Sequence, residues 1–108
     1  MKTHSRATLQ AIRLLGGMIR VRRLESRMTS EDLAARVGIS RALLFRIEKG
    51  DPACSIGSAF EAAAVLGIPL FDNGEGGSIA AHLAQQEKTL SLLPAAARPV
   101  GRSVRDDF

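Results

Sequence analysis

Residues 30–50 of the chain read SEDLAARVGISRALLFRIEKG. Thr29, directly before this stretch, is a good helix N-cap, and Asp32 three residues later completes the pattern of a capping box. Apolar residues at 33, 34 and 37 then fall on one helical face, and Gly38 supplies the left-handed conformation that often ends a helix. The pattern predicts a short amphipathic helix that ends in a sharp turn.

A second short helix is expected to begin after Ser40 and to stop at Gly50, Asp51 and Pro52. At about 100° per residue, one side of it is apolar: Leu43, Leu44 and Ile47. The opposite side is largely cationic: Arg41, Ala42, Phe45, Arg46 and Lys49. Two short helices that meet at a glycine, the second with a cationic face, are typical of a helix-turn-helix motif that enters the major groove of DNA. The alternative is an ordinary helical hairpin whose cationic side is a solvated surface.

The charge of the chain is unevenly distributed. Residues 1–50 carry 11 basic and 4 acidic side chains, a net charge of +7, whereas residues 51–108 carry 4 basic and 7 acidic side chains, a net charge of −3. A basic half that holds the motif is the electrostatic pattern of DNA binding. At 108 residues, the chain is expected to form one small domain with a tail.

Several other classes of protein are disfavoured by the sequence. No apolar run is long enough to cross a bilayer, and no signal peptide is visible, so we expect a cytoplasmic, nucleoid-associated protein without a membrane partner. The single cysteine, Cys54, excludes an internal disulfide. His4 and His82 are isolated and no phosphate-binding glycine loop follows a strand, so we expect no enzyme, no catalytic residue, no metal and no cofactor.

A longer helix is expected before the motif, from about Arg6 to Ser26. Its predicted core stripe is Ile12, Leu15 and Ile19. Arginines recur at every seventh residue, at positions 13, 20 and 27, and such a row can track DNA phosphates or be a solvated face. The pair Gly16–Gly17 marks either close packing or a break in this helix.

The region after the motif is expected to add two more helices. The first runs from Ser55 to about Leu66, with a buried stripe of Ile56, Phe60, Ala63 and Leu66. Residues 68–71 are too short to classify, so a short strand there stays open. A Gly- and Asp-rich linker precedes a helix from Ser78 to about Leu93, and residues 94–108 are expected to be a flexible tail. The predicted organisation is a DNA-binding domain at 1–72, a loop and helix for dimer or partner contact at 73–93, and the tail.

The segment from Leu15 to about Leu70 resembles the XRE family of helix-turn-helix regulators, which share the fold of the lambda repressor and Cro. The run from Arg27 to Pro52 is similar to that family throughout, and the Gly-Asp-Pro exit followed by Ser-Ile-Gly resembles the HipB-type antitoxins, which pair with a HipA-type kinase toxin. The resemblance implies an all-α, lambda-repressor-like bundle of about five helices.

The resemblance also assigns roles to individual residues. Arg41, Ala42 and Arg46 match positions that usually meet base edges, and the arginine fork suits guanine O6 and N7. Ser40 and Lys49 match positions that touch phosphate or groove edges, and Ser30 stands where the family commonly has a glutamine for a backbone contact. The arginine row adds Arg20 and Arg27 as candidate phosphate contacts. Arg23 and Glu48 match a buried ion pair that braces the recognition helix. Phe45 either packs on a thymine methyl or lies against the next helix, and we favour the second.

Taken with the family resemblance, the sequence predicts a sequence-specific repressor that binds a palindromic operator as a homodimer. The main hypothesis is the antitoxin of a type II toxin–antitoxin system, which represses its own operon and neutralises a HipA-like kinase. Two alternatives stay open: a stand-alone phage or chromosomal regulator without a toxin partner, and a protein-interaction module that has lost DNA binding.

Overall fold

The computed structural model describes residues 3–71 and 78–97, and within them it contains five α-helices and no strand. The helices are α1 (Arg6–Glu25), α2 (Ser30–Val37), α3 (Arg41–Lys49), α4 (Ile56–Val65) and α5 (Ile79–Ser91). The all-α prediction is confirmed. A short strand at 68–71 is wrong, because the backbone there forms only bends and irregular structure. The chain divides into two units, Met1–Leu70 and Phe71–Phe108, which we describe separately.

All five helices begin in the same way. A Ser or Thr in extended conformation precedes each helix, and its hydroxyl accepts a hydrogen bond from the backbone N–H three residues later, at 3.0–3.2 Å. These caps are Ser5, Thr29, Ser40, Ser55 and Ser78. Each cap satisfies one of the N–H groups that the first helical turn leaves without a partner. The helix starts predicted after residues 29, 40, 55 and 78 are therefore confirmed.

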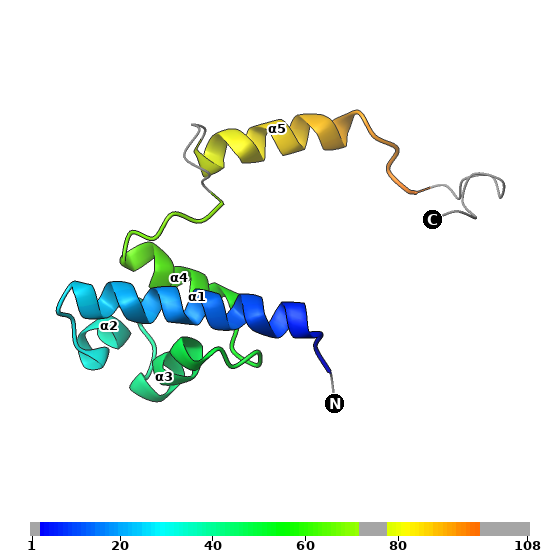
Figure 1. Ribbon diagram of the computed structural model, residues 1–108. Coiled ribbons are helices and arrows are strands. Elements are labelled where there is room, and N and C mark those ends of the chain that lie inside the picture. The colour runs from blue at the N-terminus through cyan, green and yellow to red at the C-terminus, as the bar shows by residue number, and fades with distance from the viewer. Residues whose placement is uncertain (1–2, 72–77, 98–108) are drawn as a thin grey trace. The chain divides into compact units, whose positions relative to one another are not determined.

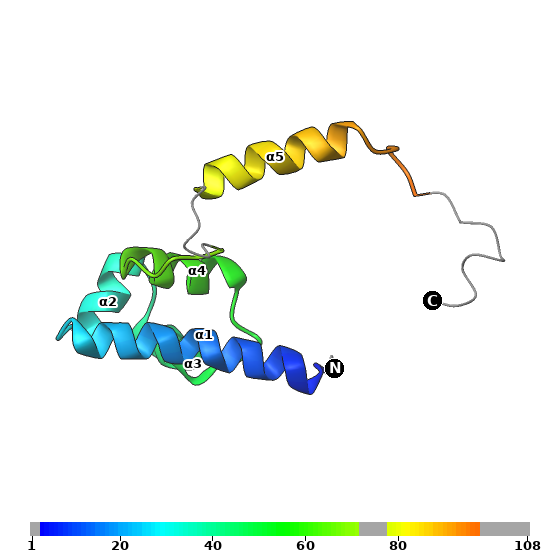
Figure 2. The same cartoon turned by 45° about the horizontal axis from the view of Figure 1, so that its top comes forward.

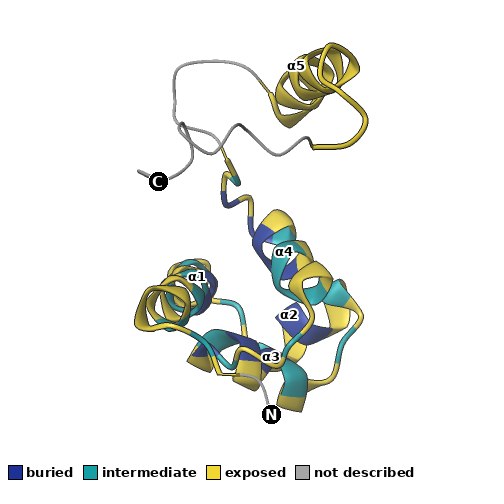
Figure 3. Cartoon of the chain, turned by 90° about the vertical axis from the view of Figure 1, so that its right-hand side faces the viewer, coloured by how far each residue is buried: buried dark blue, intermediate teal, exposed yellow. Residues whose placement is uncertain are grey.

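The first unit is a bundle in which α1 packs across α3 and against α4, while α2 packs against both α3 and α4 (Figures 1 and 2). Its core is aliphatic and draws on every one of these helices. The buried apolar residues are Ile19, Leu33, Ala34, Leu44, Ile47, Ala62, Ala63, Leu66 and Ile68. Figure 3 shows these buried positions turned toward one another, with exposed residues on the outer sides of the helices. The buried alanines of α2 and α4, which pack against each other, are Ala34, Ala62 and Ala63.

Two glycines set the geometry of α1 and of the turn. Gly38 ends α2 with φ of 82°, a left-handed conformation that glycine adopts without steric cost. Gly16 is buried in an unbroken α1, and a Cβ atom added to it would collide with the backbone carbonyl oxygen of Ile47 and lie 2.9 Å from that of Glu48. Close packing is therefore the correct interpretation of Gly16, and a break in the helix is wrong.

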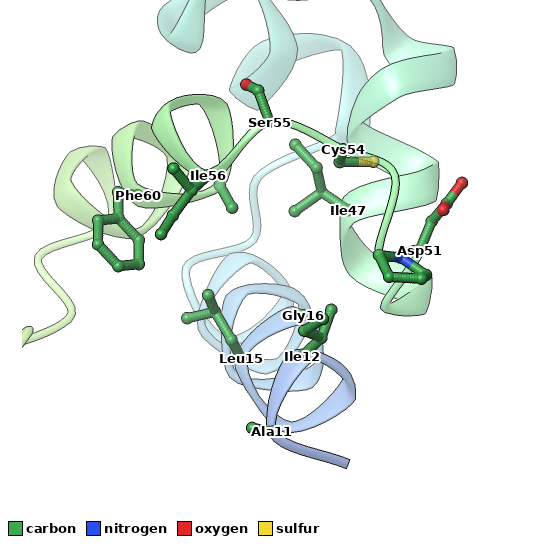
Figure 4. Close-up of a pocket in the computed structure, with 12 residues that line it drawn as sticks. Ala11, Ile12, Leu15, Gly16, Ile47, Asp51, Cys54, Ser55, Ile56 and Phe60 are labelled. Carbon is green, nitrogen blue, oxygen red and sulfur yellow. The ribbon is translucent and has the colours of Figure 1, made fainter. Parts of the chain in front are cut away.

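The predicted stripe of α4 is only partly correct. Ala63 and Leu66 are buried, but Ile56 is 70% exposed and Phe60 is half-buried outside the core. Both line an apolar pocket of about 310 Å³ between the N-terminal half of α1, the loop after α3, and α4 (Figure 4). The helical period places Ile56 on the face that turns toward α1, but an open pocket lies there in place of packed core, so Ile56 stays exposed.

The second unit contains α5, whose residues are all exposed. Ile79, Leu83 and Leu90 form an apolar stripe at helical spacing along it, and the exposed Leu93 lies just beyond its C-cap. The predicted linker falls on residues 72–77, and most of the predicted flexible tail falls on 98–108; both stretches lie outside the described residues. Among the helices that are described, none combines the length and the apolar character needed to span a membrane.

Candidate nucleic-acid interface

The outer face of α3 is a compact group of exposed side chains on a helix that is fixed at both ends. Ser40 caps its start, and Gly50 ends it in a left-handed conformation. The outer face consists of Arg41, Ala42, Phe45, Arg46 and Lys49, all exposed. The inner face is buried through Leu44 and Ile47. Because α3 packs against both α1 and α2, the outer face is presented by a rigid support.

A buried ion pair holds the inner face of α3 to α1. The Arg23 guanidinium donates two hydrogen bonds to the Glu48 carboxylate, from Nε at 2.7 Å and from Nη2 at 3.1 Å. It also donates from Nη1 to the backbone carbonyl of Met28, at 3.1 Å. The two side chains are only 9% and 7% exposed. The hydrogen bonds with Glu48 raise the pKa of Arg23 above its ordinary value, against the opposing effect of burial. The structure thus brings together the two residues that the resemblance pairs.

A second ion pair lies on the outer face. Arg46 Nε donates to Asp51 Oδ2 at 2.8 Å, and the side chains are 49% and 32% exposed. Asp51 Oδ1 accepts the backbone N–H of Ala53 at 2.9 Å, so both carboxylate oxygens have a partner. These hydrogen bonds, from Ala53 first and from Arg46 second, lower the pKa of Asp51 below its usual value. The Arg46 side chain is therefore tethered at the end of α3.

Phe45 does not lie against the next helix. Its side chain is 61% exposed on the outer face, and the Lys49 ammonium lies 5.4 Å from the ring centroid, within the range of a cation–π contact. The packing that we favoured from sequence is therefore wrong. An aromatic ring and a cation are displayed side by side in the middle of the cationic surface.

The other candidate DNA contacts differ in exposure and lie at the start of α3, on α2, and on or just after α1. Ser40 is exposed, but its hydroxyl already serves as the α3 cap. Ser30 is half-buried at the first position of α2. Arg20 is exposed on α1, whereas Arg27 lies beyond the C-cap of α1 in a left-handed turn with φ of 57°. The row of arginines at every seventh residue therefore stops at Arg20, because the helix ends before it reaches position 27.

Two residues of this region have roles that the sequence analysis missed. Asp51 was interpreted only as part of a helix stop, yet it anchors Arg46 across the glycine that reverses the chain. Arg22 donates from Nη1 to the backbone carbonyl of Leu66 at 3.1 Å, and so satisfies the C-terminal end of α4 from α1. An acidic residue two positions after the end of a helix with a cationic face is a signal for the first role; nothing local indicates the second.

The described residues offer little for metal or thiol chemistry. No group of three His, Cys, Asp or Glu side chains in the described part of the chain is placed to hold a metal ion. Cys54 is half-buried in the loop between α3 and α4, and burial raises the pKa of its thiol, which favours the less reactive protonated form.

Comparison with known proteins agrees with this geometry. A family model described as a helix-turn-helix matches residues 19–73, which is just over half of the chain and includes all of α2, α3 and α4. Searches of curated proteins and of solved structures found no match. The matched segment contains both residues of the buried Arg23–Glu48 ion pair and the whole outer face of α3. The chain therefore belongs to the XRE family of helix-turn-helix DNA-binding regulators.

Proposed function

We propose that this chain is a sequence-specific repressor that reads DNA with the outer face of α3. The observation that carries this proposal is that α3 displays three basic side chains outward while a nearly buried ion pair fixes its inner face. A helix held in this way can enter the major groove with little further ordering of its backbone on binding. Arg41 and Arg46 would read base edges with Ala42 between them.

Contacts with the DNA backbone would come from the two ends of α3 and from α1. Lys49 and Ser40 lie at opposite ends of α3, and Arg20 and Arg27 lie on or just after α1. Such contacts fix the register of a protein on the duplex but carry no sequence information. Ser30 at the start of α2 would contact the DNA backbone through a short side chain. Binding to the chromosome would place the protein in the cytoplasm, on the nucleoid.

We also propose that the protein acts as a homodimer on a two-fold operator and that the region 73–93 provides the contact. Support comes from the apolar stripe of α5, which is unusual for a helix that is exposed throughout. One recognition helix makes few base contacts, so two half-sites are needed for useful affinity. Replacing Leu83 and Leu90 with glutamate should give monomers in sedimentation velocity and weaken operator binding, while the first unit keeps its melting temperature.

The biological role that we propose is that of an antitoxin that represses its own operon and neutralises a HipA-like kinase. It is supported by the similarity of the segment from Gly50 to Gly57 to the HipB-type pattern. Co-expression with a kinase encoded beside the gene should yield a stable complex and relieve growth inhibition. Purification without any partner would favour a stand-alone regulator instead.

Fluorescence anisotropy with DNA from upstream of the gene tests the central proposal. Log K should fall linearly with log salt, by roughly 0.9 for each phosphate neutralised, and binding should exceed that of a scrambled duplex. Absence of binding at low salt would refute DNA recognition and leave a protein-interaction module as the remaining function.

A further inference from the structure

The Arg46 guanidinium group is held by an ion pair through only one of its three nitrogen atoms, Nε. Nε is engaged by Asp51 Oδ2 at 2.8 Å, which leaves the four N–H donors of the two terminal nitrogens available. Those donors form the fork that bonds guanine O6 and N7 together. An arginine that is tethered through Nε presents this fork in a limited range of directions. The contact with Asp51 thus restricts Arg46 without consuming the groups that read a base.

Asp51 is itself well fixed. The left-handed Gly50, with φ of 81°, turns the chain so that Asp51 follows α3 directly. Its second oxygen accepts the Ala53 N–H at 2.9 Å. In Figure 4 the Asp51 carboxylate points away from the apolar pocket that the neighbouring residues line. The carboxylate therefore faces Arg46 because the loop geometry directs it there.

We propose that Asp51 is a specificity-determining residue, which positions Arg46 for a base edge and disfavours capture of Arg46 by phosphates. This inference rests on the proposed function of α3. A free arginine can swing to the nearest phosphate of any duplex, and such contacts are independent of sequence. A carboxylate at its Nε both limits that movement and repels the DNA backbone. Asp51 would therefore lower affinity for random DNA while it supports affinity for the operator.

The alternative is that Asp51 only caps the loop after α3. Asp51→Asn separates the two roles, because the amide oxygen can still accept the Ala53 N–H but the negative charge at Arg46 is lost. Glu61→Gln is a matched control: it removes one negative charge from an exposed position of α4, and among the described residues the Glu61 side chain forms no hydrogen bond or ion pair with α3. Asp51→Ser, which can also cap, serves if the Asn variant is unstable.

The experiment uses the full chain and two duplexes, the best sequence that the wild-type protein selects from a random pool and a scrambled version of it. Anisotropy gives Kd for each duplex, and their ratio is the discrimination. We expect Asp51→Asn to reduce the discrimination by at least about fivefold, with tighter binding of the scrambled duplex, as one misdirected bidentate contact should do. Glu61→Gln should leave the ratio unchanged. In an Arg46→Ala background, Asp51→Asn should have no further effect on the ratio.

Three results would overturn the inference. Unchanged discrimination in Asp51→Asn would make Asp51 a loop residue only. Unchanged discrimination in Arg46→Ala, with operator binding intact, would show that Arg46 reads no base. An equal loss in Asp51→Asn with or without Arg46 would place the effect elsewhere. If the wild-type protein selects no sequence, the proposed function fails first, and the inference fails with it.

Discussion

Each face of α3 takes part in one arginine–carboxylate pair, in opposite surroundings: Glu48 on the inner face pairs with Arg23 of α1, and Arg46 on the outer face pairs with Asp51 of the following loop. Arg23 and Glu48 are 9% and 7% exposed and meet through two hydrogen bonds, whereas Arg46 and Asp51 are 49% and 32% exposed and meet through one. A buried pair is costly to break because either partner alone is left as an unpaired charge. An exposed pair contributes little to stability because water and salt screen it. The inner pair therefore supports the fold, whereas the outer pair can be changed with little loss of stability.

The largest effect should follow from breaking the inner pair. Glu48→Ala leaves the Arg23 guanidinium buried with only the Met28 carbonyl as a partner, at an expected cost of about 3–5 kcal/mol. A unit of this size has a total stability of roughly 4–10 kcal/mol, so the variant should be close to unfolding. Urea denaturation followed by circular dichroism measures the loss. Replacing Arg23 and Glu48 together with Met and Leu should restore most of it. A single variant that loses under about 1 kcal/mol would contradict burial of the pair.

The adjacent residues Gly16 and Gly17 in α1 offer a test of the close contact between α1 and the inner face of α3. Gly16→Ala would push a methyl group into the backbone carbonyls of Ile47 and Glu48, at about 1–3 kcal/mol, and would shift α3 away from α1. Gly17→Ala is its matched control, because the added Cβ meets no atom within 4 Å apart from the adjoining residues and backbone of its own helix. This control should gain up to about 1 kcal/mol in helix propensity. Thermal melts of the two variants should move in opposite directions; equal shifts would mean that α1 and α3 are not in close contact.

The helix caps and Gly16 illustrate how much of the fold can be predicted from the sequence. Helix starts at Thr29, Ser40 and Ser55 were predictable because a cap is a local hydrogen bond within four residues. The role of Gly16 was left open, because the atom that excludes a side chain there belongs to α3, more than 30 residues away. Local rules locate the elements, while close contacts between elements depend on their three-dimensional arrangement.

The candidate site was predictable to a similar extent. Spacing alone places Arg41 and Arg46 on one side of α3, and the structure finds both exposed. The exposure of Phe45 was missed because an aromatic residue is usually buried, and here Lys49 covers part of its ring instead. The Arg46–Asp51 pair was missed because it joins residues five apart across a left-handed glycine, where helical spacing no longer applies.

On the outer face, substitution should change binding and leave stability unaltered. The Arg41 side chain makes no hydrogen bond or ion pair within the described residues, so Arg41→Ala should alter the stability by less than about 0.5 kcal/mol. Binding to the selected duplex should weaken by about 1–3 kcal/mol, with relaxed preference at one base position. Arg36→Ala removes the same charge from the exposed end of α2 and should weaken both duplexes equally. Equal losses on selected and scrambled DNA in Arg41→Ala would assign that residue to phosphate instead.

The smallest expected effect is the pH dependence of the outer pair. The pKa of Asp51 is lowered in the folded protein by the Ala53 N–H and by Arg46. A carboxyl group with a depressed folded pKa stabilises the protein above its unfolded pKa of about 3.9, and this contribution disappears as the pH falls through the folded value. The melting temperature of the wild type should therefore exceed that of Asp51→Asn slightly at neutral pH, and the two should converge as the pH falls below about 4. Because Asp51 stays ionised throughout the range in which DNA binding is measured, its effect on discrimination should be constant between roughly pH 6 and 8. A discrimination that varies across that range would point to a different titrating group, since the carboxylate at Arg46 has already lost its proton there.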